Sequence, residues 1–131
     1  MSKILVIEDD ADINQLLARI LKREGYEVIQ AYSGTEAILL LEKGVPDLIL
    51  LDLMLPGMSG EKVTEYIRKE KGYNVPIIVL SAKNALEHKV ELMTMGADDY
   101  ITKPFEPQEV VVRVMAVLRR YQQTEQEQIS K

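Results

Sequence analysis

The sequence predicts an α/β fold, a doubly wound (βα)5 arrangement in which five parallel strands alternate with five helices. Three apolar runs, at residues 4–7, 48–51 and 75–80, are short and nearly continuous, as is typical of strands that are buried on both faces. Segments with the apolar spacing of amphipathic helices lie between these runs. Because the alternation is regular and its connections are short, we expect a parallel sheet covered by helices on both faces.

The first helix is expected directly after the first strand. It is indicated by an apolar stripe, with Asp12 as a candidate N-cap and Gly25 after its C-terminal end. The stripe consists of Ile13, Leu16, Leu17, Ile20 and Leu21. Weaker strands are expected at 27–31 and 99–102, and the remaining helices at 34–43, 60–70, 85–95 and 107–121.

Composition limits the classes of function. The 131 residues are the size of one domain, and 16 basic against 21 acidic residues give a net charge of −5, which argues against this chain itself binding a nucleic-acid backbone. The sequence has no cysteine, so disulfides and thiolate metal sites are excluded. With no signal peptide and no membrane span, we expect a cytoplasmic protein without membrane contact. Residues 1–121 form the expected domain, and the polar residues 122–131 a linker, tail or frayed helix end.

Polar residues gather where the predicted strands end. In an open parallel sheet the carboxyl ends of the strands form one edge, and ligands bind there, at the point where the strand order reverses. The residues at these ends are Glu8, Asp9 and Asp10 after the first strand, Asp52 after the third, Ser81 after the fourth, and Lys103 and Pro104 after the fifth. We therefore expect all of them at one edge of the sheet.

Asp52 is the acid that a structural role explains least well. Asp10 and Asp12 can be helix caps, but Asp52 lies inside an apolar stretch well before the next helix, where burying its charge alone would be costly. Clustered carboxylates hold protons unless a cation lies between them, and a divalent metal with Lys103 would supply that cation. Oxygen ligands with room for water suit Mg²⁺, and Mn²⁺ similarly. An aspartate nucleophile, a metal, an ammonium group and the hydroxyl of Ser81 are the parts of a phosphoryl-transfer site.

Four motifs resemble the receiver domain of two-component response regulators, over roughly residues 2–121. They are Ile-Leu-Val-Ile-Glu-Asp-Asp at 4–10, Leu-Leu-Asp-Leu-Met-Leu-Pro-Gly at 50–57 with Gly60, Val-Leu-Ser-Ala at 79–82, and Asp-Asp-Tyr-Ile-Thr-Lys-Pro-Phe at 98–105. All stand in the order and spacing of that family. The resemblance implies the flavodoxin-like form of the predicted fold, with strand order 2-1-3-4-5.

The resemblance also implies a role for each residue of the acidic edge. Asp52 would be the phosphoacceptor. Asp9 and Asp52 would bind Mg²⁺ directly, together with the backbone carbonyl of Met54, while Glu8 would act mainly through water. Lys103 would contact the phosphoryl group.

A second set of residues would carry the signal, by the same resemblance. Ser81 would donate a hydrogen bond to a phosphoryl oxygen once Asp52 is modified. Tyr100 would then turn inward and change the surface of the fourth helix, fifth strand and fifth helix. A half-exposed strand aromatic is the alternative interpretation of Tyr100. The Lys103–Pro104 peptide would be cis.

The last helix has two faces. Its expected buried face is Val110, Val111, Val114, Val117 and Leu118, and a second face holds Glu109, Arg113, Ala116 and Arg120. A solvated charged face explains the second set. The chain also resembles OmpR-type winged-helix regulators, whose receivers pair symmetrically through the fourth helix, fifth strand and fifth helix. That resemblance implies a homodimer with the cross-subunit pairs Lys89–Glu109, Asp98–Arg120 and Asp99–Arg113.

Together these features predict a phosphorylation switch, with only self-phosphorylation and self-dephosphorylation chemistry, rather than an enzyme. A sensor histidine kinase would phosphorylate Asp52, and a winged-helix domain absent from this chain would bind DNA and control transcription. The alternatives are a Mg²⁺-dependent aspartate phosphohydrolase or transferase, a flavodoxin-like cofactor carrier, and a pseudo-receiver that never takes phosphate. No Asp lies two residues after Asp52, which argues against the phosphohydrolase or transferase. The loop after the first strand is acidic, which argues against a flavin phosphate. No acid or lysine of the motif is missing, which argues against the pseudo-receiver.

Overall fold

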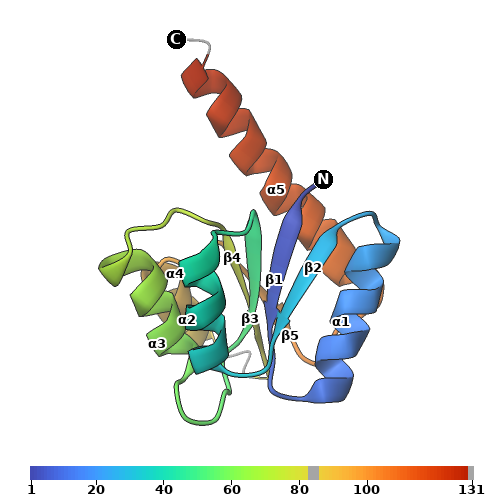
Figure 1. Ribbon diagram of the computed structural model, residues 1–131, viewed down its shortest axis with the longest axis vertical. Helices are drawn as coiled ribbons and strands as arrows, with labels where there is room; N and C mark the ends of the chain where they lie inside the picture. Colours follow the sequence, from blue (N-terminus) through green and yellow to red (C-terminus); the bar gives the residue numbers. More distant parts are fainter. Residues whose placement is uncertain (83–85, 130–131) are drawn as a thin grey trace.

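The computed structural model of the chain describes residues 1–82 and 86–129. Its five strands are all parallel and lie in the order β2-β1-β3-β4-β5, which confirms the predicted flavodoxin-like, doubly wound sheet (Figure 1). The strands are β1 (Lys3–Ile7), β2 (Glu27–Ala31), β3 (Leu48–Asp52), β4 (Ile77–Ser81) and β5 (Asp99–Thr102). The order reverses at β1, because β2 pairs on one side of it and β3 on the other.

The helices cover both faces of the sheet (Figure 1). Their bounds are α1 (Ala11–Arg23), α2 (Gly34–Lys43), α3 (Gly60–Glu65) continued by the π-helix η1 (Tyr66–Glu70), α4 (Leu86–Thr94) and α5 (Pro107–Ile129). Apolar residues of α1 and α5 form one core cluster with the sheet, and those of α2, α3, η1 and α4 form the other. Within the described chain, no helix is long and apolar enough to cross a membrane.

The central strands supply both clusters at once. In β1, Ile4 and Val6 pack with α1 and α5, whereas Leu5 and Ile7 pack with the helices of the other face. Strands β3 and β4 alternate in the same way, which is why their sequences are continuous apolar runs rather than alternating ones. Strand β4 begins at Ile77 and not at the expected residue 75, because Pro76 has no N–H to donate to the ladder.

Helix α1 differs from its prediction in two details. Its N-cap is Asp10, whose side chain accepts from the Ile13 N–H at 3.1 Å, so Asp12 lies in the first turn and is not the cap. The buried face is also rotated: Leu16 is 37 % exposed, whereas the fully buried position is Asn14. The buried side of α1 consists of Asn14, Leu17, Ala18 and Leu21.

Three other helices depart from their expected bounds. The helix expected over 60–70 changes from α to π at Tyr66, where the Lys71 N–H donates to the Tyr66 carbonyl at 3.0 Å. The helix expected over 85–95 is found as α4, and its expected first residue, 85, lies outside the described residues. Helix α5 continues to Ile129 instead of ending at 121, since the intervening residues include neither glycine nor proline.

Gly60 lets the start of α3 approach the end of β3. Its N–H donates to the Leu53 carbonyl at 3.1 Å, and a Cβ here would lie 2.7 Å from both the Asp52 carbonyl oxygen and the Leu53 Cα. We expect Gly60→Ala to lower the free energy of unfolding by about 2 kcal/mol, because backbone atoms cannot yield as a side chain can. Urea unfolding measures this. The matched control is Gly44→Ala, because a Cβ at Gly44 would have no atom within 4 Å apart from its chain neighbours. Equal stability of the two variants would contradict the expectation.

Candidate functional site

The predicted polar residues do gather at the carboxyl edge of the sheet. Asp52 ends β3 and Ser81 ends β4, while Glu8 and Lys103 each follow the last residue of their strand. The pairing of Asp52 with Leu80 and of Ser81 with Thr102 sets these ends at the same level. Glu8, Asp52 and Ser81 are at most 2 % exposed, so two carboxylates are buried side by side.

Lys103 is the cation that faces these acids. Its Nζ lies 2.7 Å from Glu8 Oε1 and 3.4 Å from Asp52 Oδ2, and its backbone N–H donates to the Ser81 carbonyl at 2.9 Å. The Lys103–Pro104 peptide is cis. Burial lowers the pKa of Lys103, but the hydrogen bond to Glu8 and the charge of Asp52 outweigh burial and raise the pKa above its ordinary value. Lys103 therefore carries its positive charge at neutral pH.

Glu8 is a buried acid that holds its proton more strongly than an ordinary glutamate does. Burial and the contact with Asp52 raise the pKa of Glu8 to about 7, although Lys103 and the Asp10 N–H, which donates to Glu8 Oε2 at 3.2 Å, act in the opposite direction. One lysine thus does not compensate two buried carboxylates. Asp52 Oδ1 accepts from the Met54 N–H at 3.2 Å, which fixes the orientation of that carboxylate.

Without metal, Glu8 should make stability depend on pH. The folded chain holds the Glu8 proton up to about pH 7, whereas the unfolded chain releases it near the ordinary value of 4.5. The folded state binds more protons between these values, so the free energy of unfolding falls as pH rises, by an amount on the order of 2 kcal/mol. We expect Glu8→Gln to remove this fall, measured by urea unfolding in a chelator at about pH 5 and pH 8. The exposed Glu42→Gln is the control, and an unchanged slope in Glu8→Gln would refute the assignment.

The acids also form a cluster that could hold a metal. Glu8, Asp9 and Asp52 each offer one carboxylate oxygen, and these three oxygens lie within 4.8 Å of one another. Asp9 is exposed, so the cluster opens to solvent and leaves room for water ligands. Hard carboxylate oxygens with an open side fit Mg²⁺ or Mn²⁺. A divalent cation would also supply the charge that Lys103 alone does not.

Tyr100 lies behind this edge, in β5. Its side chain is 8 % exposed and belongs to the core cluster of α2, α3, η1 and α4, so the alternative of a half-exposed aromatic is wrong. The Lys89 Nζ of α4 lies 5.2 Å from the centre of its ring, a cation–π contact. The ring thus joins β5 to α4 inside one chain.

The charged residues predicted for a dimer interface have partners within the chain. The Nη1 of Arg113 lies 3.1 Å from Asp99 Oδ1, and its Nε lies 3.2 Å from Glu109 Oε2. Burial lowers the pKa of the Arg113 guanidinium, but hydrogen bonding to Asp99 and Glu109 raises it overall. Apolar side chains on α4 and α5 are also about half exposed: Val90, Met93, Val112 and Met115.

Asp98 belongs to a network that the sequence did not indicate. Its carboxylate accepts from Arg68 at 3.1 Å, from the Ile77 N–H at 2.8 Å and from the Tyr121 hydroxyl at 2.7 Å. Arg68, which lies in η1, also donates to the carbonyls of Gly96 and Tyr73. Burial and the hydrogen bond to Asp98 raise the pKa of Tyr121 to about 12. This network ties η1, β5 and α5 together.

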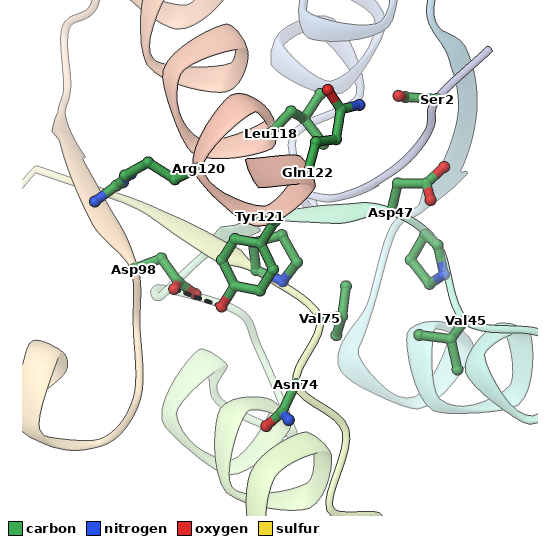
Figure 2. Close-up of a pocket in the computed structure, with 12 residues that line it drawn as sticks. Ser2, Val45, Asp47, Asn74, Val75, Asp98, Leu118, Arg120, Tyr121 and Gln122 are labelled. Atoms are coloured by element: carbon green, nitrogen blue, oxygen red, sulfur yellow. Dashed lines mark hydrogen bonds between the residues drawn. The ribbon is translucent and has the colours of Figure 1, made fainter. Parts of the chain in front are cut away.

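A hollow of about 710 Å³ lies beside this network, at the amino edge of the sheet (Figure 2). Figure 2 shows Tyr121 reaching from α5 to Asp98 at its wall. Neither Asp52 nor Lys103 lines it. The hollow therefore lies apart from the acidic edge.

Asn14 is the residue near the acidic edge that the sequence analysis missed. It is completely buried on α1, and its amide donates to the carbonyls of Glu8 and Ala31, each at 3.0 Å. A signal was present, since Asn14 stands at helical spacing with Leu17, Ala18 and Leu21. A polar residue in such a stripe marks a position where the fold needs a hydrogen bond.

Comparison with known proteins gives a consistent result. Residues 4–115 match the family model described as the response regulator receiver domain. The chain is similar to the receiver domain of a Francisella response regulator (35 % identity, TM-score 0.87, covering 92 % of this chain and 99 % of that one). It is also similar to a CheY-like receiver domain protein from Methanospirillum hungatei (30 %, 0.87, 95 % and 98 %). NtrX from Brucella abortus matches at 27 % identity and TM-score 0.92, over 99 % of this chain but only 29 % of its own.

Proposed function

The chain belongs to the response regulator receiver domain family, and on this premise we propose that it is a switch in which Asp52 accepts a phosphoryl group. Receiver domains serve phosphorylation-regulated signalling, take their phosphoryl group from a histidine kinase and bind Mg²⁺ at an acidic site. The observation that supports Asp52 most directly is its burial, 2 % exposed, between Glu8 and Lys103 at the edge where the strand order reverses.

The proposed step is attack by an Asp52 carboxylate oxygen on the phosphorus of a kinase phosphohistidine. The new O–P bond forms an acyl phosphate, and the N–P bond breaks, which leaves the histidine to take up a proton. Mg²⁺ bound by Asp9, Asp52 and the Met54 carbonyl, with Glu8 acting through water, would neutralise charge on the transferring group. Lys103 would move its ammonium group from the carboxylates to the phosphoryl oxygens.

The modification would be read by Ser81 and Tyr100. The Ser81 hydroxyl, buried beside Asp52, would donate to a phosphoryl oxygen. Tyr100 already packs inward from β5 toward α4, so a shift of the β4 end would alter how α4, β5 and α5 present their surface. Pro104, which follows Lys103 directly in the chain, would belong to the same switch.

The expected output is dimerisation in the OmpR-type manner. Two copies would pair through α4, β5 and α5, with the half-exposed apolar residues of α4 and α5 at the centre and the pairs Lys89–Glu109, Asp98–Arg120 and Asp99–Arg113 around them. A winged-helix output domain would then bind DNA in the cytoplasm. We propose residues 1–121 as the switch and 122–131 as its connection to that domain.

Mass spectrometry and sizing test both parts of the proposal. The chain is incubated with Mg²⁺ and a small phosphodonor, and separately with beryllofluoride, which mimics a phosphoryl group on a carboxylate. We expect one phosphoryl group on Asp52 after incubation with the phosphodonor, and a larger hydrodynamic size after either treatment. An unmodified Asp52 would refute the switch and favour a pseudo-receiver, whereas a modified chain that stays monomeric would refute only the dimer.

A further inference from the structure

Asn14 is a completely buried amide on an otherwise apolar face of α1. It lies on the face of α1 that packs against the sheet, beside Leu17 and Leu21, and is 0 % exposed. Burying an amide among apolar side chains is unfavourable unless hydrogen bonds satisfy both its nitrogen and its oxygen. Asn14 forms three, two as donor and one as acceptor, and so meets this requirement.

The orientation of the Asn14 amide is fixed by chemistry. The carbonyls of Glu8 and Ala31 can only accept, so the Nδ2 group must face them, at 3.0 Å each. The Oδ1 atom then faces Gln30, whose Nε2 donates to it at 2.9 Å. Gln30 Nε2 also lies 3.3 Å from the Tyr32 hydroxyl. A reversed amide would place oxygen against two carbonyls, so a single arrangement satisfies every group.

These hydrogen bonds hold the ends of two strands. The Glu8 N–H donates to the same Ala31 carbonyl at 3.1 Å, so the ends of β1 and β2 meet on Asn14. The acidic turn, Glu8, Asp9 and Asp10, begins at this point. At the other end of the turn, the Asp10 side chain caps α1. The acidic turn is thus held at both ends by α1, on one side through Asn14.

We propose that Asn14 is a positioning residue for the metal-binding acids, an inference that rests on the proposed function. Asn14 acts through the backbone carbonyl of Glu8, to which its amide donates, and not through a carboxylate of the cluster. Its hydrogen bonds keep the Glu8 and Asp9 carboxylates at the spacing found in the cluster with Asp52. Residues that orient metal ligands from outside the ligand set commonly contribute tenfold or more to affinity.

The variant Asn14→Asp separates positioning from charge. It keeps the shape of the side chain but replaces the Nδ2 donor by an oxygen that would oppose both carbonyls. The added negative charge alone would strengthen Mg²⁺ binding, whereas loss of positioning would weaken it. We expect Mg²⁺ affinity, measured by calorimetry, to fall about tenfold. In the metal-free chain we also expect faster hydrogen exchange at the Asp9 and Asp10 amides.

Two further variants keep the test decisive. Leu21→Ala, on the same buried face two turns along α1, lowers stability without touching the acidic turn and should change Mg²⁺ affinity less than about twofold. Gln30→Ala leaves Asn14 in place but removes the donor to its Oδ1, which weakens the hold on the amide. This variant should lower the affinity about threefold even if Asn14→Asp does not fold.

The outcomes distinguish this inference from the function on which it rests. Asn14→Asp binding Mg²⁺ as tightly as the unaltered chain, or an equal loss in Leu21→Ala, would overturn the positioning role alone. If Asn14→Asp does not fold, unchanged affinity in Gln30→Ala would overturn it. An unaltered chain that binds no Mg²⁺ would overturn the proposed function as well.

Discussion

Asp52→Asn should give a folded chain that incorporates no phosphoryl group. Asparagine has the shape of aspartate and can still accept from the Met54 N–H, but its neutral amide oxygen is a poor nucleophile for phosphorus. The substitution also removes one of two buried negative charges, so the free energy of unfolding should stay the same or rise by about 1 kcal/mol. Intact-mass spectrometry after incubation with Mg²⁺ and a phosphodonor measures the first effect, and urea unfolding the second.

Asp47→Asn is the matched control for Asp52→Asn. Asp47 is an exposed carboxylate that accepts from the Lys3 N–H at 2.7 Å, next to the first residue of β3 and so at the opposite edge of the sheet. Its variant should be phosphorylated like the unaltered chain. Phosphorylation of Asp52→Asn at the normal rate would show that another acid accepts the group, and Asp9 would be the first to examine.

Lys103→Met should slow phosphorylation by about a hundredfold or more. Methionine keeps most of the apolar stem but removes the ammonium group that would neutralise charge on the transferring phosphoryl group, a kind of contact that is commonly worth that factor. The loss also leaves the Glu8 and Asp52 carboxylates buried without their cation. In the intact site the Lys103 Nζ lies 2.7 Å from Glu8 Oε1 and 3.4 Å from Asp52 Oδ2. In a chelator above pH 7, we expect the free energy of unfolding to fall by about 2 kcal/mol.

Mg²⁺ should restore much of that stability but little of the rate. The metal would replace the missing positive charge near the acids, but it would not replace the contact of the Lys103 ammonium group with the phosphoryl oxygens. Time-resolved mass spectrometry and urea unfolding, each with and without Mg²⁺, separate the two effects. Lys62→Met, an exposed lysine on α3, is the control, and equal rates for the two lysine variants would contradict a direct role for Lys103.

The elements that the sequence predicted best are those with one dominant signal. Strand β3 is buried on both faces, and its continuous apolar run is typical of such a strand. Helix α2 was found at its expected bounds, between the N-cap Ser33 and Gly44. The acidic edge followed from topology, because parallel strands bring their carboxyl ends together. No long-range contact had to be known to place Asp52 near Lys103.

The features that sequence could not supply depend on contacts between distant residues. The change from α to π at Tyr66 has no sequence signature, and the bonds of Arg68 to Gly96 and Asp98 cross about thirty positions of the chain. Asn14 was missed for a different reason. The predicted stripe included Leu16, which the structure leaves partly exposed, and left out Asn14, because hydrophobicity alone does not reveal a polar residue with a structural task.

The ion pairs within a single chain have a consequence for how two chains would associate. Arg113 already pairs with Asp99, and Asp98 with Arg68, before any partner arrives. A symmetric dimer would therefore exchange intramolecular pairs for intermolecular ones and gain few new ones. Affinity would then depend mainly on the apolar side chains of α4 and α5, while the charges would select register and reject other partners. Raising the ionic strength should accordingly weaken such a dimer much less than its charged rim suggests.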